Sequence, residues 1–289
     1  MSGIFVPVVN KYDESLTEDL TGACSLSIQF SFESICFSIF YSPLNKYLAI
    51  ESVDFGKFLS PESSIGTFST YIRNHPWLRL PYSEIRIFYE AVKTTLVPSP
   101  LFLEDHKENF AQFNFASDIN HQVLSDKIRN LDAYIVYEVH KAFSDLWADF
   151  FPAHTLNCHA GRLIDLVMLM NKNSPFQKRV FINVRKSYVD IAVHEGNKLL
   201  FFNSFAFRTR EDFIYYVIFV MEQLAIHPEE TEWMLSGFID RDTPMFDILY
   251  KYVKNIRFLS GSDAFKYSYH FDEIPEHYFF NLINSRLCE

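Results

Sequence analysis

Three side chains of types that bind metal ions lie close together in the middle of the chain. His154, Cys158 and His159 lie four positions and one position apart, and imidazole nitrogen and thiolate sulfur are ligands that zinc prefers. No partner set of such residues is evident elsewhere, and free cysteine is often simply buried. We therefore interpret this cluster as structural and predict no metal site. Nor do the residue spacings define a Ser/His/Asp set or a carboxylate pair, so no catalytic residue is predicted.

Two charged clusters could contact a small ion. Arg185 and Lys186 fall in a predicted hairpin turn, where they could bind an anion. Residues 240–242 place two acids around an arginine, shortly after Gly237. A solvated turn or loop explains both clusters as well, and we favour that interpretation.

Glycine is scarce and widely spaced. The chain has 8 glycines, and the closest two, Gly56 and Gly66, are ten positions apart. No GxGxxG, GxxxxGK[ST] or GxSxG motif can therefore occur. These loops need glycine where the backbone approaches a phosphate or turns sharply beside a nucleophile. A Rossmann cofactor site, a P-loop and an α/β-hydrolase elbow are excluded on this ground.

Composition and charge describe a globular protein without a basic surface. The 289 residues are 48% hydrophobic and 21% charged, and 26 basic against 36 acidic residues leave a net charge of −10. This balance argues against nucleic-acid binding. The four cysteines form no CxxC pair, so no zinc-ribbon or thioredoxin-type motif is present. The N-terminus does not resemble a signal peptide. The longest apolar stretch, 213–221, is too short for a membrane span. We predict a reduced, cytoplasmic protein with no membrane span.

The hydrophobic pattern predicts an alternation of strands and helices in both halves of the chain. In the first half, strands are expected at 26–30, 35–41, 46–51 and 84–89, with 93–97 pairing with the last of these, and a hairpin at 122–124 and 133–139. Helices are expected at 65–74, 103–113, 140–150 and 158–170. In the second half, strands are expected at 179–184, 188–194, 198–204, 232–235 and 256–259, and helices at 210–225, 246–252 and 275–287.

The two halves repeat one pattern. A shift of 154 positions places residues 26–41 on residues 180–195, so that Ile28 falls on Ile182 and Ile35 on Val189. Both copies continue as strand, helix and strand, which favours a true duplication over a chance match of two meanders. The predicted organisation is an N-terminal arm (1–24), a first domain (25–172), a linker at 171–178, and a second domain with a C-terminal helix (178–289).

Two such units in succession resemble the actin-like ATPase superfamily, which includes actin, sugar kinases, heat-shock chaperones and the pilus-assembly protein PilM. Residues 181–224 resemble the second phosphate segment of PilM-like proteins. Residues 83–115, especially 95–98 and 101–102, are similar to a bacterial family of uncharacterised proteins with this fold. The resemblance implies an α/β fold with two RNase H-like subdomains in the actin-like ATPase arrangement, and it covers most of residues 24–289.

The first and third nucleotide segments of that superfamily are altered here. The first phosphate loop is Asp-x-Gly-[Ser/Thr], and the corresponding positions are Gln29 and Ser31, followed by Phe32. The adenosine segment is reduced to Gly237 and Pro244. An amide therefore replaces the acid that would act through a metal-bound water.

The second phosphate loop is altered further. The superfamily pattern Asp-x-Gly-Gly-Gly-Thr-Thr-Asp begins here with Asn183, and Arg185, Lys186 and Ser187 replace its glycines. Only the last acid survives, as Asp190. Loss of the leading acids and of the glycines should abolish Mg-ATP hydrolysis by the superfamily mechanism.

The resemblance and these departures favour a catalytically inactive member that acts as a protein-binding or scaffold module and needs no cofactor. The alternative is a nucleotide-binding protein or weak ATPase that holds ATP and Mg²⁺ through residues 29–32, residues 183–187 and Gly237. A sugar-kinase-like phosphotransferase ranks third, because no acid can be assigned as its base. The missing motifs thus lean against an enzyme without deciding the matter.

Aromatic residues are the other unusual feature. The 31 Phe, 16 Tyr and 3 Trp make up 17% of the chain. Eight of them fall within residues 201–219: Phe201, Phe202, Phe205, Phe207, Phe213, Tyr215, Tyr216 and Phe219. We expect a Phe-rich core between sheets, with an exposed patch for a protein partner as the alternative.

Overall fold

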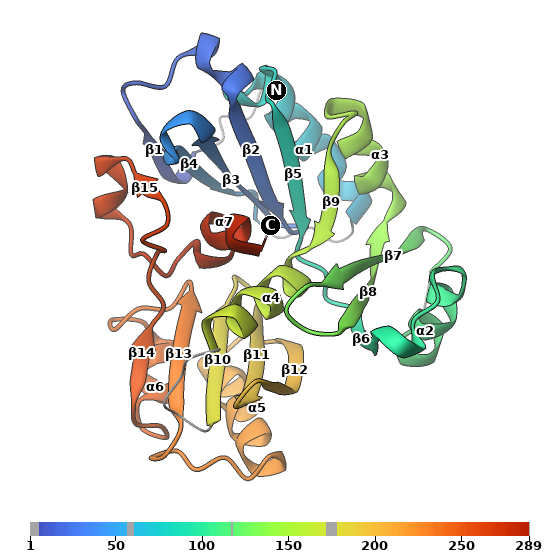
Figure 1. Cartoon of the computed structure of the whole chain (residues 1–289), viewed down its shortest axis with the longest axis vertical. Coiled ribbons are helices and arrows are strands. Elements are labelled where there is room, and N and C mark those ends of the chain that lie inside the picture. The colour runs from blue at the N-terminus through green and yellow to red at the C-terminus, as the bar shows by residue number, and fades with distance from the viewer. Residues whose placement is uncertain (1–5, 57–60, 117, 172–177, 289) are drawn as a thin grey trace. The chain divides into compact units, whose positions relative to one another are not determined.

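The chain divides into two units, one with two β-sheets and one with a single β-sheet (Figure 1). The computed structural model describes residues 6–56, 61–116, 118–171 and 178–288. Unit 1 comprises residues 1–128, 132–161 and 262–273, and unit 2 comprises residues 129–131, 162–261 and 274–289. Unit 1 thus includes the stretch expected to form an arm, and most of the expected linker, 172–177, lies outside the described residues.

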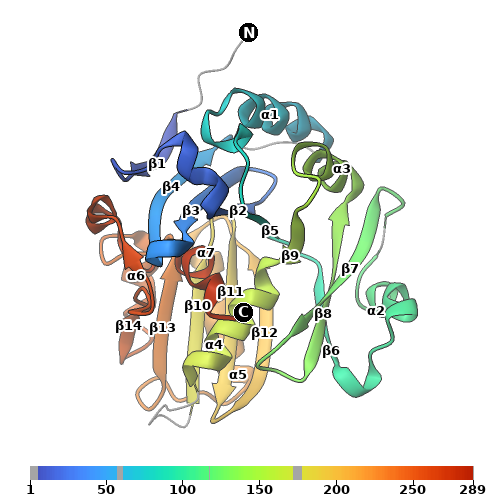
Figure 2. The same ribbon diagram turned by 45° about the horizontal axis from the view of Figure 1, so that its top comes forward.

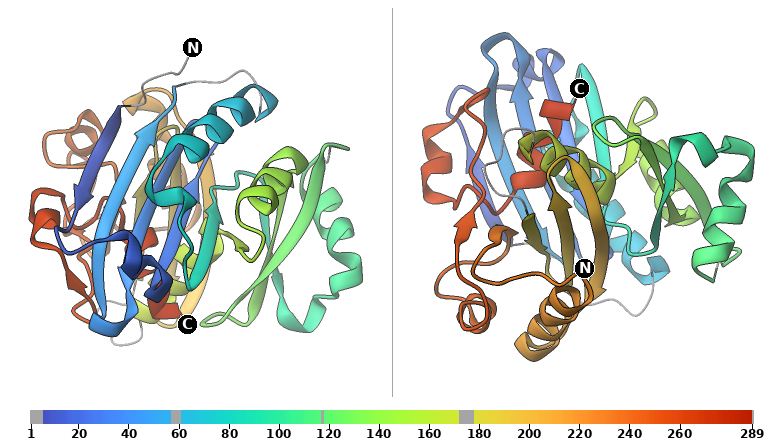
Figure 3. Two further views of the ribbon diagram at one scale, coloured as in Figure 1. Left: turned by 90° about the horizontal axis from the view of Figure 1, so that it is seen from above. Right: turned by 60° about the horizontal axis from the view of Figure 1, so that its bottom comes forward.

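The sheet of unit 1 has the strand order β1-β4-β3-β2-β5-β9, and a short β15 also pairs with β4. Its strands are β1 (Pro7–Tyr12), β2 (Cys24–Phe30), β3 (Ser34–Tyr41), β4 (Lys46–Asp54), β5 (Glu84–Tyr89), β9 (Thr155–Cys158) and β15 (Lys266–Tyr267). β2, β3 and β4 form an antiparallel meander, and β5 and β9 add to it in parallel. Two helices, α1 (Pro61–Asn74) and α3 (Lys141–Phe150), pack against β2 of this sheet (Figure 3).

A second, three-stranded sheet of order β6-β8-β7 is inserted between β5 and β9. It consists of β6 (Thr94–Pro98), β7 (His121–Ile128) and β8 (Ala133–His140), and α2 (Lys107–Asn114) packs on it. The predicted hairpin of β7 and β8 is confirmed. The predicted pairing of 93–97 with β5 is wrong, because β2 and β9 occupy both edges of β5 and β6 pairs with β8 instead.

The sheet of unit 2 has the order β12-β11-β10-β13-β14. Its strands are β10 (Lys178–Val184), β11 (Tyr188–Glu195), β12 (Lys198–Ala206), β13 (Glu232–Gly237) and β14 (Ile256–Phe258). Residues of α4 (His159–Asn171) and α7 (Phe280–Asn284) pack on one face, and residues of α5 (Arg210–Gln223) and α6 (Pro244–Leu249) pack on the other (Figure 2). Side chains alternate between the two faces along β10: Phe181 packs in the cluster with α4 and α7, and Val180 and Ile182 pack in the cluster with α5 and α6.

The strand pairings confirm the internal repeat. Ile28 pairs with Phe37 in unit 1, and Ile182 pairs with Ile191 in unit 2, which are the same positions shifted by 154. β2 then pairs in parallel with β5 as β10 does with β13. The two sheets therefore share one order of antiparallel meander and parallel additions.

Local sequence signals explain where two helices of unit 2 begin. Thr209 and Asp212 form a capping box before α5, in which Thr209 Oγ1 accepts from the Asp212 amide at 3.1 Å and Asp212 Oδ2 accepts from the Thr209 amide at 3.1 Å. Thr243 caps α6, and Pro244 occupies its first turn. Both ends satisfy backbone donors that would otherwise lack partners.

The C-terminal helix is shorter than predicted. We expected residues 275–287 to be helical, but α7 spans only Phe280–Asn284 and a 3-10 turn, Ser285–Cys288, follows it. The preceding residues instead bind the end of β13, since the His277 carbonyl accepts from the Gly237 amide at 2.8 Å. A tertiary contact therefore replaces the first helical turns.

The core of unit 1 contains a cluster of aromatic rings. The Phe30 ring centroid lies 5.2 Å from that of Phe143, 4.8 Å from that of Trp147 and 6.2 Å from that of Phe68. All four side chains are fully buried. The cluster joins β2 to α1 and α3, so aromatic residues supply much of the core between this sheet and its helices.

Candidate functional site

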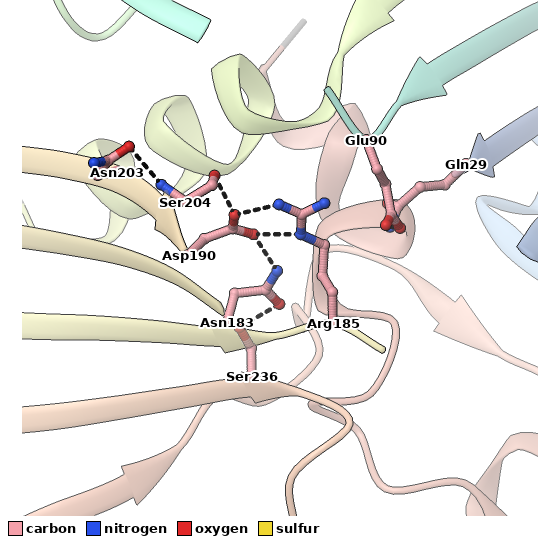
Figure 4. Close-up of polar contacts among 8 residues, drawn as sticks. All are labelled: Gln29, Glu90, Asn183, Arg185, Asp190, Asn203, Ser204 and Ser236. Carbon is pink, nitrogen blue, oxygen red and sulfur yellow. Dashed lines mark hydrogen bonds and ion pairs between the residues drawn. The ribbon is translucent and has the colours of Figure 1, made fainter. Parts of the chain in front are cut away.

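A row of four polar side chains crosses the sheet of unit 2 where the second phosphate loop was expected (Figure 4). Ser204, Asp190, Asn183 and Ser236 occupy directly paired positions on β12, β11, β10 and β13. Ser204 Oγ donates to Asp190 Oδ1 at 2.6 Å, Asn183 Nδ2 donates to Asp190 Oδ2 at 2.9 Å, and Ser236 Oγ donates to Asn183 Oδ1 at 3.0 Å. The row is thus one continuous hydrogen-bonded chain.

Arg185 completes this row from the turn between β10 and β11. Its Nη2 lies 2.7 Å from Asp190 Oδ1 and its Nε lies 3.0 Å from Asp190 Oδ2, which is a bidentate ion pair. The side chain of Asp190 is fully buried and that of Arg185 is 5% exposed. The Arg185 guanidinium also lies 5.1 Å from the ring centroid of Tyr188, and the Arg185 amide donates to the Tyr188 carbonyl to close the turn.

This geometry limits what Asp190 can do. A carboxylate offers about four lone-pair positions, and Asp190 accepts at least four hydrogen bonds, two from Arg185 and one each from Asn183 and Ser204. A metal ion or a metal-bound water would have to displace one of these donors. The expectation that Arg185 belongs to a solvated turn is wrong, since its guanidinium is buried against Asp190.

Gly237 lies at the end of the same row. Its φ is +81°, and a Cβ at this position would lie 2.1 Å from the Val184 carbonyl oxygen. Only glycine fits here, because the backbone of β13 passes directly against β10. Lys186 and Ser187 lie in the turn itself, where Lys186 is exposed and the Ser187 carbonyl accepts from the Phe207 amide at 3.0 Å.

The corresponding place in unit 1 contains a different pair. Gln29 occupies the repeat position of Asn183, and its Nε2 donates to Glu90 Oε1 at 2.7 Å (Figure 4). The Oε1 of Gln29 is buried without a hydrogen-bond partner among the described residues. Cys36 on β3 pairs with Gln29 and occupies the repeat position of Asp190. Burial and the Glu90 and Glu51 carboxylates raise the pKa of the Cys36 thiol.

The first turn of unit 1 is closed on itself. Ser31 Oγ lies 2.9 Å from Ser34 Oγ, and the Ser31 amide donates to the Ser34 carbonyl at 3.0 Å. Phe32 stacks on Phe143, with ring centroids 5.6 Å apart. Within each unit, the structure therefore brings the predicted residues together: Gln29, Ser31 and Phe32 in unit 1, and Asn183, Arg185, Lys186, Ser187 and Gly237 in unit 2.

Three residues of these sites, Glu90, Ser204 and Ser236, were not predicted from the sequence. Glu90 directly follows β5 and Ser236 lies near the end of β13, and each strand runs parallel to its neighbour in the meander. Residues at the carboxyl ends of neighbouring parallel strands meet at one sheet edge, and this signal could have identified both. Ser204 could have been found only from the strand register.

The His154 cluster shows structural roles. His154 Nδ1 lies 2.7 Å from the Phe151 carbonyl oxygen, and Cys158 and His159 are fully buried. Across residues 6–56, 61–116, 118–171 and 178–288, no group of three or more His, Cys, Asp or Glu side chains is placed to hold a metal ion.

The aromatic residues at 201–219 contribute to both the core and the surface. Phe213 is fully buried and Phe207 is 9% exposed, whereas Tyr215 is 62% and Phe219 is 40% exposed. Five rings form a ladder along β12 and α5, with successive centroids 4.5–6.4 Å apart: Phe201, Phe205, Tyr216, Tyr215 and Phe219. We call this set the aromatic ladder.

Comparisons with known proteins support the fold. A model of the DUF3822 family, proteins of unknown function, matches residues 13–256. A Bacteroides thetaiotaomicron protein of unknown function with an actin-like ATPase fold superposes with a TM-score of 0.74 at 22% identity, covering 84% of this chain and 93% of that one. PilM-PilN, a type IV pilus biogenesis complex, gives a TM-score of 0.60 at 8% identity, covering 90% of this chain and 95% of that one.

The actin-like ATPase fold expected from the sequence is thereby confirmed. No curated protein sequence matches the chain. Among the helices of the described residues, none has both the length and the apolar character needed to cross a membrane.

Proposed function

The chain belongs to the DUF3822 family, and we propose that it is a protein-binding or scaffold module of the actin-like ATPase fold that does not hydrolyse ATP. The observation that carries this proposal is the Arg185–Asp190 pair. In this proposal, Arg185 supplies internally the positive charge that a metal ion would otherwise bring to Asp190, and the donors around the carboxylate leave no place for that ion.

A partner surface is the second part of the proposal. The exposed rings of the aromatic ladder lie beside β12, which is an edge strand of its sheet. Edge strands present unpaired backbone groups, and exposed aromatic rings are enriched in protein interfaces. A structural neighbour of this fold was solved together with a protein, as PilM-PilN. We assign the ladder to a protein partner that contributes an apolar, extended segment.

The chain contains four free cysteines, which suits a reducing compartment. We therefore propose a cytoplasmic location. Fractionation of native cells with an antibody to the chain tests this directly, and recovery in a membrane or extracellular fraction would contradict it.

Calorimetric titration with ATP and with ADP, each with and without Mg²⁺, tests the first part. We expect no Mg²⁺-dependent heat and no phosphate release. Phosphate release by the unaltered chain would contradict the proposal, and micromolar, Mg²⁺-dependent binding without release would favour the nucleotide-binding candidate below.

The partner surface is tested with a double variant, Tyr215→Ser with Phe219→Ser. Its matched control is Phe113→Ser, because Phe113 is 91% exposed on α2 of the other unit. We expect proteins from native cytoplasm that bind the unaltered chain to bind the control and to be lost from the double variant. Equal retention by all three chains would refute the assignment.

One observation favours nucleotide binding as a second candidate. The unpartnered Oε1 of Gln29 and the adjacent Glu90 carboxylate are oxygen ligands of the kind that Mg²⁺ prefers. If ATP binds, we expect Gln29→Leu to remove the Mg²⁺-dependent part of the binding. A variant that binds Mg-ATP as the unaltered chain does would exclude this role for Gln29.

A further inference from the structure

A pocket lies in unit 1 between β1, β4 and the C-terminal end of α1. Its volume is about 560 Å³, which falls in the range of small-molecule sites. Three aromatic side chains line it together with one carboxylate, that of Glu51. They are Tyr12 on β1, Tyr71 on α1, and Trp77 on the 3-10 turn Trp77–Arg79. β1 and β4 lie side by side in Figure 2, with α1 at the same end of the unit.

The carboxylate of Glu51 is held rigidly in its ionised form. Tyr12 Oη donates to its Oε2 at 2.5 Å, Tyr71 Oη donates to its Oε1 at 2.6 Å, and His75 Nε2 lies 3.2 Å from both oxygens. Burial raises the pKa of Glu51, but these three partners lower it more, so the pKa ends below its usual value. Burial and the Glu51 charge raise the pKa values of Tyr12 and Tyr71, so both phenols stay neutral.

His75 is the third partner of the Glu51 carboxylate. A carboxylate can only accept, so Nε2 must carry the hydrogen of this contact. Nδ1 is buried without a hydrogen-bond partner among the described residues.

No lysine or arginine side chain of the described residues lines the pocket beside Glu51. Among the residues that line it, all within the described chain, there is no Lys or Arg. Lys11 pairs with Glu273, and the Arg73 guanidinium lies over the ring of Phe150. Asn10 and Asn74 supply the remaining polar groups of the lining, and amides carry no charge.

Aromatic faces complete this electrostatic arrangement. The Tyr12 and Trp77 rings are stacked with centroids 5.9 Å apart. The face of an aromatic ring attracts cations, most strongly for tryptophan. Anions would meet the Glu51 charge, so the pocket selects against them.

We propose that this pocket binds an organic ammonium ion, either a free amine or the lysine side chain of another protein. The positive group lies against the Trp77 and Tyr12 rings in the field of Glu51, and the amides of Asn10 and Asn74 accept from it where it carries hydrogens. The site shares no residue with the phosphate-loop positions or with the aromatic ladder.

Titration of the full chain with choline and with its uncharged isostere 3,3-dimethylbutan-1-ol tests the charge requirement, with calorimetry and tryptophan fluorescence as readouts. We expect choline to bind at least about tenfold more tightly than the alcohol. Equal affinities, or no binding of choline and of Nα-acetyl-lysine amide, would overturn the proposal. Tighter binding of Nα-acetyl-lysine amide than of choline would indicate a lysine side chain as the source, and the reverse order a free amine.

Two variants locate the site. Glu51→Gln should abolish binding of the charged probe, but it also alters a buried hydrogen-bonded group. Asn10→Lys avoids that difficulty, because Asn10 is exposed and the new ammonium competes at the mouth of the pocket. Its control is Gln112→Lys, the same change at an exposed amide on α2 of unit 1. Choline affinity should fall at least about tenfold in Asn10→Lys only, and unchanged affinity in Asn10→Lys would place the cation elsewhere.

Discussion

Replacement of Arg185 by alanine should destabilise unit 2 strongly, because it leaves a buried carboxylate without its counter-charge. Asp190 would lose the two donors at 2.7 and 3.0 Å while remaining fully buried. Hydrogen bonds to charged groups contribute about 1.5–3 kcal/mol each, and breaking a buried ion pair by removing one partner costs about 3–5 kcal/mol. We therefore expect Arg185→Ala to lower the free energy of unfolding by about 3–5 kcal/mol.

Two further variants separate charge from packing. Arg185→Lys keeps a positive charge but cannot bond both oxygens in the bidentate manner, so its loss should be intermediate. Arg185→Met combined with Asp190→Asn removes both charges. This double variant should cost less than Arg185→Ala alone, because no uncompensated charge remains.

Hydrogen exchange in increasing urea, read on peptides from β10 and β11, measures the loss where it occurs. Peptides from β2 and β3 in unit 1 serve as internal references. Arg210→Ala is the matched control, since Arg210 pairs with Glu211 on the surface and such pairs contribute little. A loss below about 1 kcal/mol for Arg185→Ala, or a double variant less stable than Arg185→Ala, would refute the assignment of a buried, charge-compensated site.

Three other changes test separate features. Burial and Arg179 lower the pKa of His194 to about 4. The buried neutral ring therefore contributes fully to stability above about pH 6.5, and the free energy of unfolding falls by up to about 3 kcal/mol as the pH drops to 4. Urea unfolding from pH 7.5 to 4 should show this decrease, and His194→Leu should reduce it. Gly237→Ala should lower the free energy of unfolding by more than about 2 kcal/mol, because its Cβ would overlap a carbonyl oxygen at 2.1 Å. Gly196→Ala is the control, since Gly196 has a positive φ but open space around it, and it should cost about 1 kcal/mol by thermal unfolding. Equal losses of stability in the two variants would contradict the steric argument. Phe68→Ala, at the centre of the aromatic cluster, should lower the free energy of unfolding by about 3–5 kcal/mol. Phe113→Ala, at a 91% exposed position, should leave the unfolding midpoint unchanged. Similar midpoints for the two variants would show that the cluster does not stabilise unit 1.

The fold was predictable because its signals are local and repeated. Alternating apolar residues located the meander strands of both units, and the shift of 154 positions that aligns the two halves also relates their observed strand pairings. β9 was not predicted, since four residues are too few for a periodic pattern. The partner of β6 was also missed, because pairing depends on which sheet edge is free and not on the residues of the strand.

The candidate site was predictable in position but not in chemistry. The turn at 185–187 was located correctly, yet Arg185 was assigned to solvent, because an arginine in a short polar turn usually points outward. Its burial depends on Asp190 across the hairpin and on Ser204 one strand further away. Only the register of three strands places these groups together, and that register is a long-range property.

The absence of glycine from this turn and the presence of Arg185 are two aspects of one arrangement. A phosphate-binding loop needs several backbone amides directed at its ligand, and glycine permits that close approach. Here the Arg185 amide is already bound to the Tyr188 carbonyl, and the guanidinium folds back over the Tyr188 ring onto Asp190. Restoring glycine at 185 alone would remove the counter-charge of Asp190 without providing a metal ion in its place. A single substitution should therefore destabilise unit 2 rather than restore nucleotide binding, so any route back to a phosphate loop must first relieve the buried charge of Asp190.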